Sequence, residues 1–375
     1  MNLQLAMILL TIVIFVIILG LLVFVHELGH FIVAKRAGMK VEEFGFGFPP
    51  RMFGLKRGET IYSINWIPLG GFVKILGENG DSEDPRSFAS KSAGKRFWVL
   101  IAGVSMNFVL AAVLMSIGAG IGLPTVVVEG EQLPKNAQIR DVSVAIISVA
   151  PASPAQEAGV KVGDRILAVN GLTIDSVEQM QEATQVSAGK ATEYLFKRGK
   201  DEIRATITPR LDPPPDEGRL GVALASVGYV RYPWYQVIPQ GIVAAFRLLV
   251  ATISAFWFVI SHWISGQGVN VGLAGPVGIA VLTRDVAQLG FVYLMQFTAV
   301  LSVNLAVINA IPFPALDGGR VLFLAIEKIR GKKLPQQAEA IANTVGFALL
   351  ILLMLFVTVK DVSKFNILDR IKNIL

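Results

Sequence analysis

The sequence contains no cysteine and only three histidines among its 375 residues. The absence of cysteine excludes disulfide bonds and every metal site that depends on thiolate ligands. Any metal ion must therefore be held by His, Asp or Glu side chains. Two of the three histidines, His26 and His30, lie within five residues of each other, so this short segment is the first candidate for a metal site.

Charged residues are scarce as well. They make up 17 % of the chain, against the roughly 25 % that is usual in soluble globular proteins, and 53 % of the residues are hydrophobic. The formal net charge is +6, but the Lys and Arg residues lie beside apolar segments, as they do in the cytoplasmic loops of membrane proteins. The composition predicts a membrane protein, and the lack of a basic arm or a nucleic-acid-binding motif argues against a nucleic-acid partner.

Long apolar runs predict about four transmembrane helices. A bilayer core about 30 Å thick is spanned by roughly 20 apolar residues in a helix. The first run lacks the basic start and the small-residue cleavage site of a signal peptide, so we interpret it as a retained membrane helix. The four runs are residues 3–25, 97–123, 291–311 and 345–359.

A further apolar segment, residues 237–264, is ambiguous. Arg247 and His262 interrupt it, while Trp257 and Trp263 suit the boundary between lipid headgroups and acyl chains. We predict an interfacial helix that lies along the membrane surface. The alternative is a fifth span.

The distribution of basic residues predicts the orientation. Lys and Arg are concentrated in residues 35–96 and 320–333, whereas the first eleven residues carry no charge. By the positive-inside rule, both basic segments face the cytoplasm and both termini lie outside. Four spans satisfy this arrangement, whereas five would place the two basic segments on opposite sides. The expected location is the cytoplasmic (inner) membrane, with the lipid bilayer as a partner.

A soluble domain is predicted between the second and third spans. Residues 126–211 contain short β-branched runs, a helical segment at 176–186 and the turn signal Asn170-Gly171. The proline-rich stretch 212–216 predicts a stiff linker. The region therefore forms one small α/β domain on the outer side, while glycines and aromatic residues in 39–96 predict membrane-associated β-hairpins at the cytoplasmic mouth.

The predicted fold is an α-helical membrane protein in eight consecutive segments. They are the first span (1–38), the cytoplasmic glycine-rich β region (39–96), the second span (97–123), the soluble domain (126–211), a linker with the interfacial helix (212–287), the third span (288–319), a cytoplasmic loop (320–342), and the fourth span with a C-terminal tail (343–375).

The segment His26-Glu27-Leu28-Gly29-His30 has the chemistry of a metal-dependent hydrolase. On a helix, a spacing of four residues places both imidazoles on one face, one turn apart. A zinc ion bound there lowers the pKa of its water to about 7, and Glu27 can take and return the proton. The alternative is a chance match, but ionisable residues at membrane depth are costly unless they have a function.

A third metal ligand is expected, because catalytic zinc usually has three protein ligands and a water. No His or Glu follows His30 at the spacing of soluble metalloproteases. Asp317 lies at the cytoplasmic end of the third span, at the level of the two histidines, where Pro312 and Pro314 break the helix. Irregular backbone at this depth is tolerated where it lines a cavity, so we predict that Asp317 completes the site. An Asp that only caps a helix is the alternative.

Two motifs together resemble the site-2 protease family of intramembrane zinc metalloproteases. They are the segment 26–30 and the pattern Asn-x-x-Pro-x-Pro-x-Leu-Asp-Gly at 309–318. Residues 159–171 resemble part of a PDZ domain. A PDZ-like domain between the two motifs is similar to the bacterial regulator of sigma-E protease type. The best-known members of that type have two PDZ domains, whereas this sequence has one PDZ-like domain. The resemblance implies that His26, His30 and Asp317 bind Zn²⁺ and that Glu27 is the catalytic base.

The resemblance also implies contacts with a substrate. Asn309 and Asn304 are expected to bind the substrate backbone near the metal, with hydrogen bonding between helices as the alternative. The glycine-rich segment 44–76 is expected to pair with an unwound substrate as an added strand, unless it is a purely structural hairpin. The segment 103–111, which contains Asn107, resembles a family segment of the second span with no assigned role.

The expected activity is hydrolysis of peptide bonds within or near the transmembrane segments of single-span membrane proteins, such as anti-sigma factors or remnant signal peptides. By the same resemblance, the PDZ-like domain is expected to exclude substrates whose outer domain is untrimmed, with capture of a carboxyl terminus as the alternative. Two other functions compete. A catalytically inactive scaffold would not need Glu27, and a metal transporter would need more ionisable residues within its spans.

Overall fold

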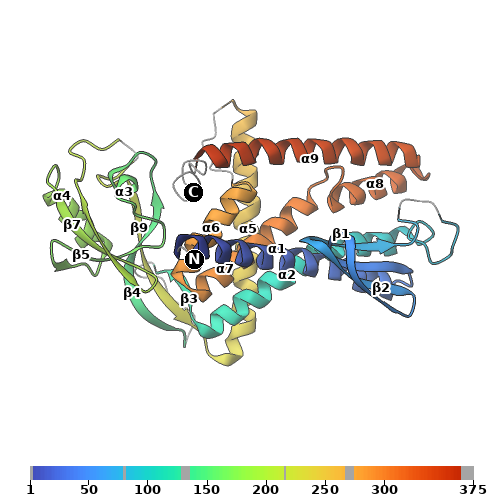
Figure 1. Cartoon of the computed structure of the whole chain (residues 1–375), viewed down its shortest axis with the longest axis horizontal. Helices are drawn as coiled ribbons and strands as arrows, with labels where there is room; N and C mark the ends of the chain where they lie inside the picture. The colour runs from blue at the N-terminus through green and yellow to red at the C-terminus, as the bar shows by residue number, and fades with distance from the viewer. Residues whose placement is uncertain (1–2, 79–81, 128–135, 215–216, 267–273, 365–375) are drawn as a thin grey trace. The chain divides into compact units, whose positions relative to one another are not determined.

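The structure is a computed structural model that describes residues 3–78, 82–127, 136–214, 217–266 and 274–364 (Figure 1). The chain divides into two compact units. The first comprises residues 1–113, 243–283 and 298–375, and the second comprises residues 114–242 and 284–297.

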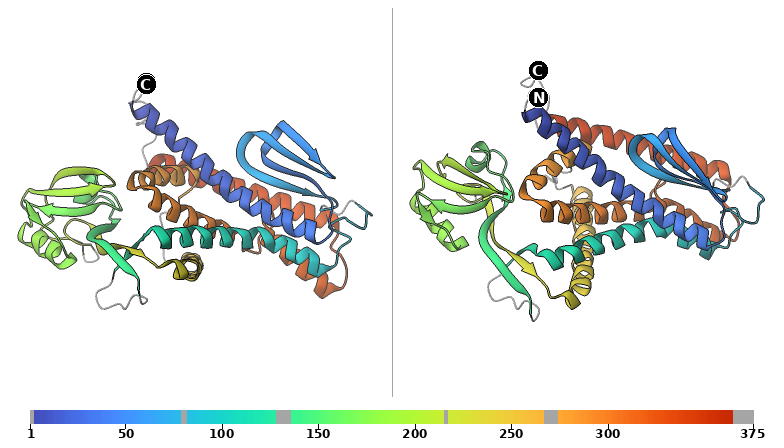
Figure 2. Two further views of the ribbon diagram at one scale, coloured as in Figure 1. Left: turned by 90° about the horizontal axis from the view of Figure 1, so that it is seen from below. Right: turned by 60° about the horizontal axis from the view of Figure 1, so that its bottom comes forward.

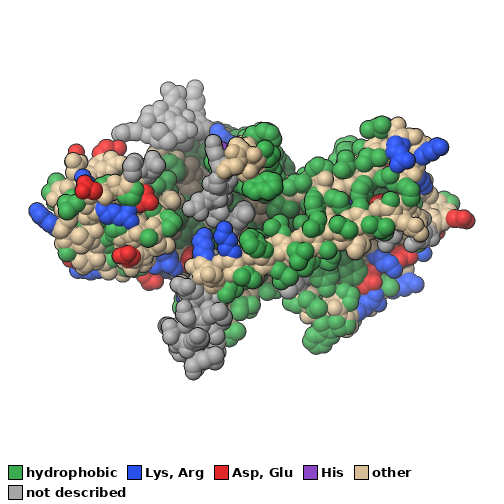
Figure 3. Space-filling view, turned by 90° about the horizontal axis from the view of Figure 1, so that it is seen from above, with side chains coloured by type: hydrophobic (Ala, Val, Ile, Leu, Met, Phe, Trp, Pro, Cys, Tyr) green, Lys and Arg blue, Asp and Glu red, His purple; other side chains and the backbone are tan. Residues whose placement is uncertain are grey.

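The first unit is built mainly from long apolar helices. Its elements are α1 (Leu3–Arg36), β1 (Val41–Arg57), β2 (Thr60–Ile75), most of α2 (Ala93–Ile121) and α5 (Trp234–Ile264), the start of α6 (Pro276–Leu289), the end of α7 (Phe291–Ala310), α8 (Asp317–Arg330) and α9 (Gln336–Lys364). Figure 3 shows hydrophobic side chains over these helices, with Lys and Arg gathered toward the end that carries β1, β2 and α8.

Five described helices are long and apolar enough to cross a membrane: α1, α2, α5, α7 and α9. The four predicted spans are all among them, although α1 and α9 are longer than the apolar runs that predicted them. By length and composition α5 is a fifth candidate, beyond the predicted count of four. Residues 243–264 of α5 run across α1 and α9 rather than along them (Figures 1 and 2), and its placement at the interface stays a prediction.

Strands β1 and β2 form the predicted hairpin region, with more pairing than a simple hairpin has. Glu43 pairs with both Ile61 and Lys74, and Phe44 pairs with both Tyr62 and Val73. The two halves of β2 therefore lie on either side of the first half of β1. The part of the sheet formed by residues 48–67 exposes apolar side chains, among them Phe53 and Trp66. Such exposure is expected of a region that meets the membrane.

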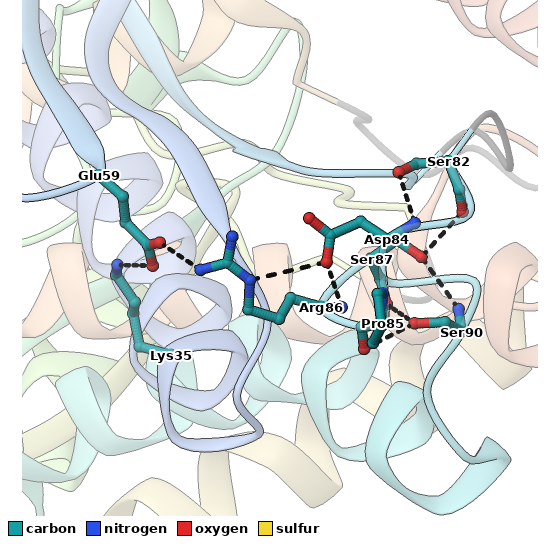
Figure 4. Close-up of polar contacts among 8 residues, drawn as sticks. All are labelled: Lys35, Glu59, Ser82, Asp84, Pro85, Arg86, Ser87 and Ser90. Carbon is teal, nitrogen blue, oxygen red and sulfur yellow. Dashed lines mark hydrogen bonds and ion pairs between the residues drawn. The ribbon is translucent and has the colours of Figure 1, made fainter.

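An ion-pair network joins this sheet to the end of α1 (Figure 4). Glu59, in the β1–β2 turn, accepts from Lys35 Nζ at 3.0 Å and from Arg86 Nη1 at 2.9 Å. Arg86 Nε also lies 3.6 Å from Asp84 Oδ1. Exposed ion pairs of this kind contribute little to stability.

The second unit contains a sheet with strand order β3-β9-β4-β5-β7-β8, and β6 pairs with β5. Its strands are β3 (Leu123–Val126), β4 (Gln138–Val149), β5 (Arg165–Val169), β6 (Leu172–Thr173), β7 (Thr192–Arg198), β8 (Asp201–Ile207) and β9 (Val222–Arg231), and its short helices are α3 (Pro154–Glu157) and α4 (Val177–Val186). The core packs Tyr194 and Phe196 of β7 against Met180 of α4 and Ile146 of β4.

The soluble domain extends further than its predicted end at residue 211. Strand β9 lies in the segment predicted to be a linker, yet it pairs with both β3 and β4 inside the sheet. Prolines 213 and 214 therefore belong to a connection between two strands of one sheet, while residues 215–216 lie outside the described part of the chain. The predicted C-terminal tail beyond residue 364 also lies outside it.

Candidate metal centre

Helix α1 carries both histidines of the 26–30 motif on one face. The ring centroids of His26 and His30 are 4.9 Å apart, and their Nε2 atoms are 3.3 Å apart. His26 is buried, with 7 % of its surface exposed. The spacing of four residues therefore produces the predicted pair of convergent imidazoles.

The loop after α7 brings Asp317 to the same point. Asp317 is the first residue of α8, and its Oδ2 lies 2.9 Å from Nε2 of His26 and 3.3 Å from Nε2 of His30. The loop is shaped by Ala315, which has a φ of 76° and whose N–H donates to Asn343 Oδ1 of α9 at 3.0 Å. The structure thus brings together the three residues that the sequence predicted as ligands.

These residues fit a zinc ion. Two imidazole nitrogens and one carboxylate oxygen converge within 4.8 Å of one another, and this donor set is one that zinc accepts. Asp317 Oδ2 is buried and has no hydrogen-bond partner of good geometry among the described residues. Gly103 of α2 leaves the adjoining space open, because a Cβ there would stand 2.6 Å from Nε2 of His26.

The orientation of His30 is set by helix α2. The Nδ1 atom of His30 lies 2.8 Å from the backbone oxygen of Val99. A carbonyl oxygen can only accept, so Nδ1 carries the proton and Nε2 presents a lone pair. This is the form of imidazole that binds a metal. The contact could not be found from the sequence, because any residue has a carbonyl group.

Glu27 lines a cavity of about 240 Å³ together with His30 and Asp317. Phe72, Val73 and Ile75 of β2 form another wall of the cavity. Glu27 follows the candidate ligand His26 in sequence, but its carboxylate is not among the three convergent ligand atoms. This is the arrangement required of a carboxylate that acts on a water or on a peptide bond inside the cavity.

A cation that belongs to neither motif also lines the cavity. Arg320 lies one turn after Asp317 on α8 and forms an ion pair with Glu78. Burial lowers the pKa of the Arg320 guanidinium, but the charge and hydrogen bond of Glu78, together with the negative charges of Asp317 and Glu339, raise that pKa above its ordinary value. Arg320 therefore stays charged at the cavity wall.

The two predicted substrate-binding asparagines lie on α7 but outside the set of described residues that line this cavity. Asn304 accepts a hydrogen bond from Thr252 Oγ1 of α5 at 3.2 Å, which is a contact between helices. Asn309 lies in the last turn of α7. Contact of either residue with substrate stays a prediction. The third histidine, His262, has its Nδ1 atom 2.9 Å from the backbone oxygen of Phe258 within α5 and is not one of the three convergent residues.

Comparison with known proteins decides the family. Residues 14–353 match the model of peptidase family M50. The chain belongs to this family. A protein of Clostridium perfringens is 37 % identical over 342 residues, which cover 91 % of this chain and 95 % of that protein. Zinc metalloprotease RasP of Geobacillus kaustophilus is 31 % identical, with 95 % of this chain and 98 % of RasP covered.

A relative with a more specific name is the regulator of sigma-W protease RasP of Bacillus subtilis. It is 30 % identical to this chain over 440 residues, which cover 94 % of this chain and 98 % of the relative. Among solved structures, the PDZ domain of an SdrC-like protein from Listeria monocytogenes is 19 % identical, with a TM-score of 0.21, and matches 23 % of this chain and 92 % of its own.

Membership of peptidase family M50 confirms the resemblance to site-2 proteases. The chain is a zinc metalloprotease with several apolar helices that can span a membrane. Zinc is its cofactor, and intramembrane proteolysis is its general activity. The predicted enzyme class and cofactor are thereby confirmed.

Proposed function

We propose that this protease cleaves single-span membrane proteins within or near their transmembrane segments, with zinc held by His26, His30 and Asp317 and with Glu27 as the general base. The observation that carries the proposal is the convergence of the three ligand atoms, from α1 and from the start of α8, beside a cavity that Glu27 lines. His30 and Asp317 are 287 residues apart in sequence (317 − 30 = 287), so only a specific fold brings them together.

Each residue has a defined part in this proposal. Zinc, when bound, acts as a Lewis acid that activates a water and polarises a peptide carbonyl. Glu27 takes the proton of the attacking water and returns it to the leaving amine. The backbone oxygen of Val99 holds the proton of His30 on Nδ1, so that Nε2 faces the metal.

Substrate binding is proposed at the edge of the β1–β2 sheet. Residues 71–75 of β2 pair with β1 on one side, and in the described part of the chain no strand pairs with their other side. Phe72 and Val73 line the cavity that also holds Glu27. An unwound segment of substrate can pair with this edge, which gives partners to the backbone groups that its own helix no longer satisfies.

The proposed substrates are anti-sigma factors or remnant signal peptides. The name of the Bacillus subtilis relative, regulator of sigma-W protease, supports the first class. The basic segments support a multi-pass protein of the cytoplasmic membrane, with the metal site toward the cytoplasm and the PDZ-like second unit and both termini on the outer side. In this position the second unit meets the outer part of a substrate before the bond is cut.

The test is cleavage of a tagged single-span substrate co-expressed with wild type, Glu27→Gln or Asp317→Ala. Both variants are expected to lose cleavage, and Glu27→Gln is expected to keep its zinc. Glu59→Gln, in the exposed network of Figure 4, is the control and should cleave normally. Equal product from wild type and Glu27→Gln would refute the proposal and favour a scaffold that captures peptides without cutting them.

A further inference from the structure

One face of helix α2 lies against both metal-binding imidazoles. Val99, Gly103 and Asn107 are spaced by four residues, so they follow one another along the same face. The backbone oxygen of Val99 contacts His30, and Gly103 leaves space beside both Nε2 atoms. Asn107 is fully buried, and its side-chain amide lies 3.2 Å from Nδ1 of His26. Each imidazole thus has one partner on α2.

The partner at Nδ1 decides whether Nε2 can bind a metal. A neutral imidazole has a proton on one nitrogen and a lone pair on the other. In His26 the Nε2 atom faces Asp317 and His30, so Nε2 must present its lone pair to the metal. Nδ1 must then carry the proton, and a buried N–H group requires an acceptor. His30 has such an acceptor in a carbonyl group, and His26 needs an equivalent one.

The Asn107 amide can provide this acceptor. With its nitrogen toward His26, Asn107 Oδ1 is buried without a hydrogen-bond partner among the described residues. Rotation of the amide by 180° turns Oδ1 toward Nδ1 and gives the buried oxygen a donor. Ser302 of α7 contacts the same turn through its hydroxyl, which donates to the backbone oxygen of Asn107 at 2.8 Å and does not touch the side-chain amide.

We propose that Asn107 is a positioning residue of the metal site, whose side-chain oxygen accepts the Nδ1 proton of His26 and so directs the Nε2 lone pair toward zinc. The inference rests on the proposed site of His26, His30 and Asp317. Helix α2 then orients both proposed histidine ligands. The backbone carbonyl of Val99 orients His30, and the side-chain amide of Asn107 orients His26. Partners of this kind fix the tautomer and ring orientation of metal-binding histidines.

The test compares zinc affinity between two replacements of similar size. Asn107→Leu removes the acceptor, and Asn107→Asp keeps an acceptor but cannot donate. Zinc affinity of the purified full-length protein in detergent is measured by competition with a chromophoric chelator. We expect Asn107→Leu to bind zinc about 10–100-fold more weakly, which is the usual cost of losing such a partner. Asn107→Asp should stay within a few-fold of wild type.

Two controls separate this role from packing. Ser302→Ala disturbs the contact at the same turn but leaves the amide in place, so it should bind zinc like wild type. Thermal unfolding of the zinc-free proteins should show that Asn107→Leu is folded. Wild-type affinity in Asn107→Leu would overturn the inference, and so would an equal loss in Asn107→Leu, Asn107→Asp and Ser302→Ala.

A further variant distinguishes failure of this inference from failure of the metal site itself. Asp317→Ala removes a proposed ligand and should lose zinc almost completely. If Asp317→Ala binds zinc as tightly as wild type, the proposed site is wrong. If Asp317→Ala loses zinc while Asn107→Leu does not, the site is correct and only the role of Asn107 is refuted.

Discussion

Replacement of Gly103 by alanine should disable the metal site, because the added methyl group would collide with both imidazoles. A Cβ on Gly103 would stand 2.6 Å from Nε2 and 2.7 Å from Cε1 of His26, and closer still to Nε2 of His30. Non-bonded atoms in good contact are about 3.5–4.0 Å apart. Either the imidazoles or helix α2 must therefore move by roughly 1 Å to admit the methyl group.

A shift of this size is larger than a zinc site tolerates. Ligand distances in metal sites stay within about 0.2 Å of their preferred values, and both histidine ligands of this site would be displaced together. We therefore expect the zinc affinity of Gly103→Ala to fall by more than the roughly 100-fold that loss of an outer partner can cost. Cleavage of a co-expressed single-span substrate should become undetectable.

The same helix offers a matched control. Gly94 also lies in α2, but a Cβ there would meet no atom within 4 Å. Alanine is favoured over glycine in a helix by up to about 1 kcal/mol, so Gly94→Ala should unfold at the same or a slightly higher temperature and bind zinc normally. Chelator competition and substrate cleavage are measured for both variants. Wild-type zinc affinity in Gly103→Ala would refute the steric argument and, with it, the described approach of α2 to the metal site.

Other predictions concern the metal, the second unit and the cavity wall. Chelation of zinc from the purified enzyme should abolish cleavage of a detergent-solubilised substrate, and added zinc should restore it; activity that survives chelation would contradict a metal mechanism. Asp164, which is 1 % exposed, accepts from Arg198 at 2.6 and 2.7 Å, so Asp164→Ala should destabilise the second unit by about 3 kcal/mol. Thermal unfolding should show no comparable loss for Glu193→Ala, whose ion pair is exposed. Glu78→Gln should lower the free energy of unfolding by about 1–3 kcal/mol, because Arg320 loses its charged partner; an unchanged denaturation midpoint would show that this ion pair has no role in stability.

The sequence predicts the parts of the site that depend on helix geometry or on a motif. The convergence of His26 and His30 follows from their spacing on any α-helix. Asp317 was predicted as a ligand for two reasons. A catalytic zinc ion usually needs a third protein ligand, and the proline-broken end of α7 places this carboxylate at the same membrane depth as the two histidines. Four of the five candidate spans were found from apolar length alone.

Other features depend on contacts that no local pattern encodes. Strand β9 was missed because the prolines before it were interpreted as the end of a domain. Its place between β3 and β4 is set by pairing with strands about 70 to 110 residues away in sequence. The orienting role of the Val99 carbonyl was missed because a backbone group leaves no trace in the sequence. Arg320 was noted as a marker of orientation, and its place on the cavity wall depends on Glu78 from another element.

The helices and the loop around the proposed metal site contact each other where their backbones approach closely. A Cβ on Gly29 of α1 would stand 2.7 Å from Met106 Cγ and closer to the backbone of Ala102, so α1 and α2 touch at the level of the histidines. A Cβ on Gly346 of α9 would collide with the backbone of Pro314, in the loop that leads to Asp317. In a membrane the hydrophobic effect does not drive helices together, and small residues that allow such contacts take its place. The glycines next to the histidines and to the Asp317 loop therefore help to set the geometry of the proposed metal site, because they fix the distance between the elements that carry its three proposed ligands.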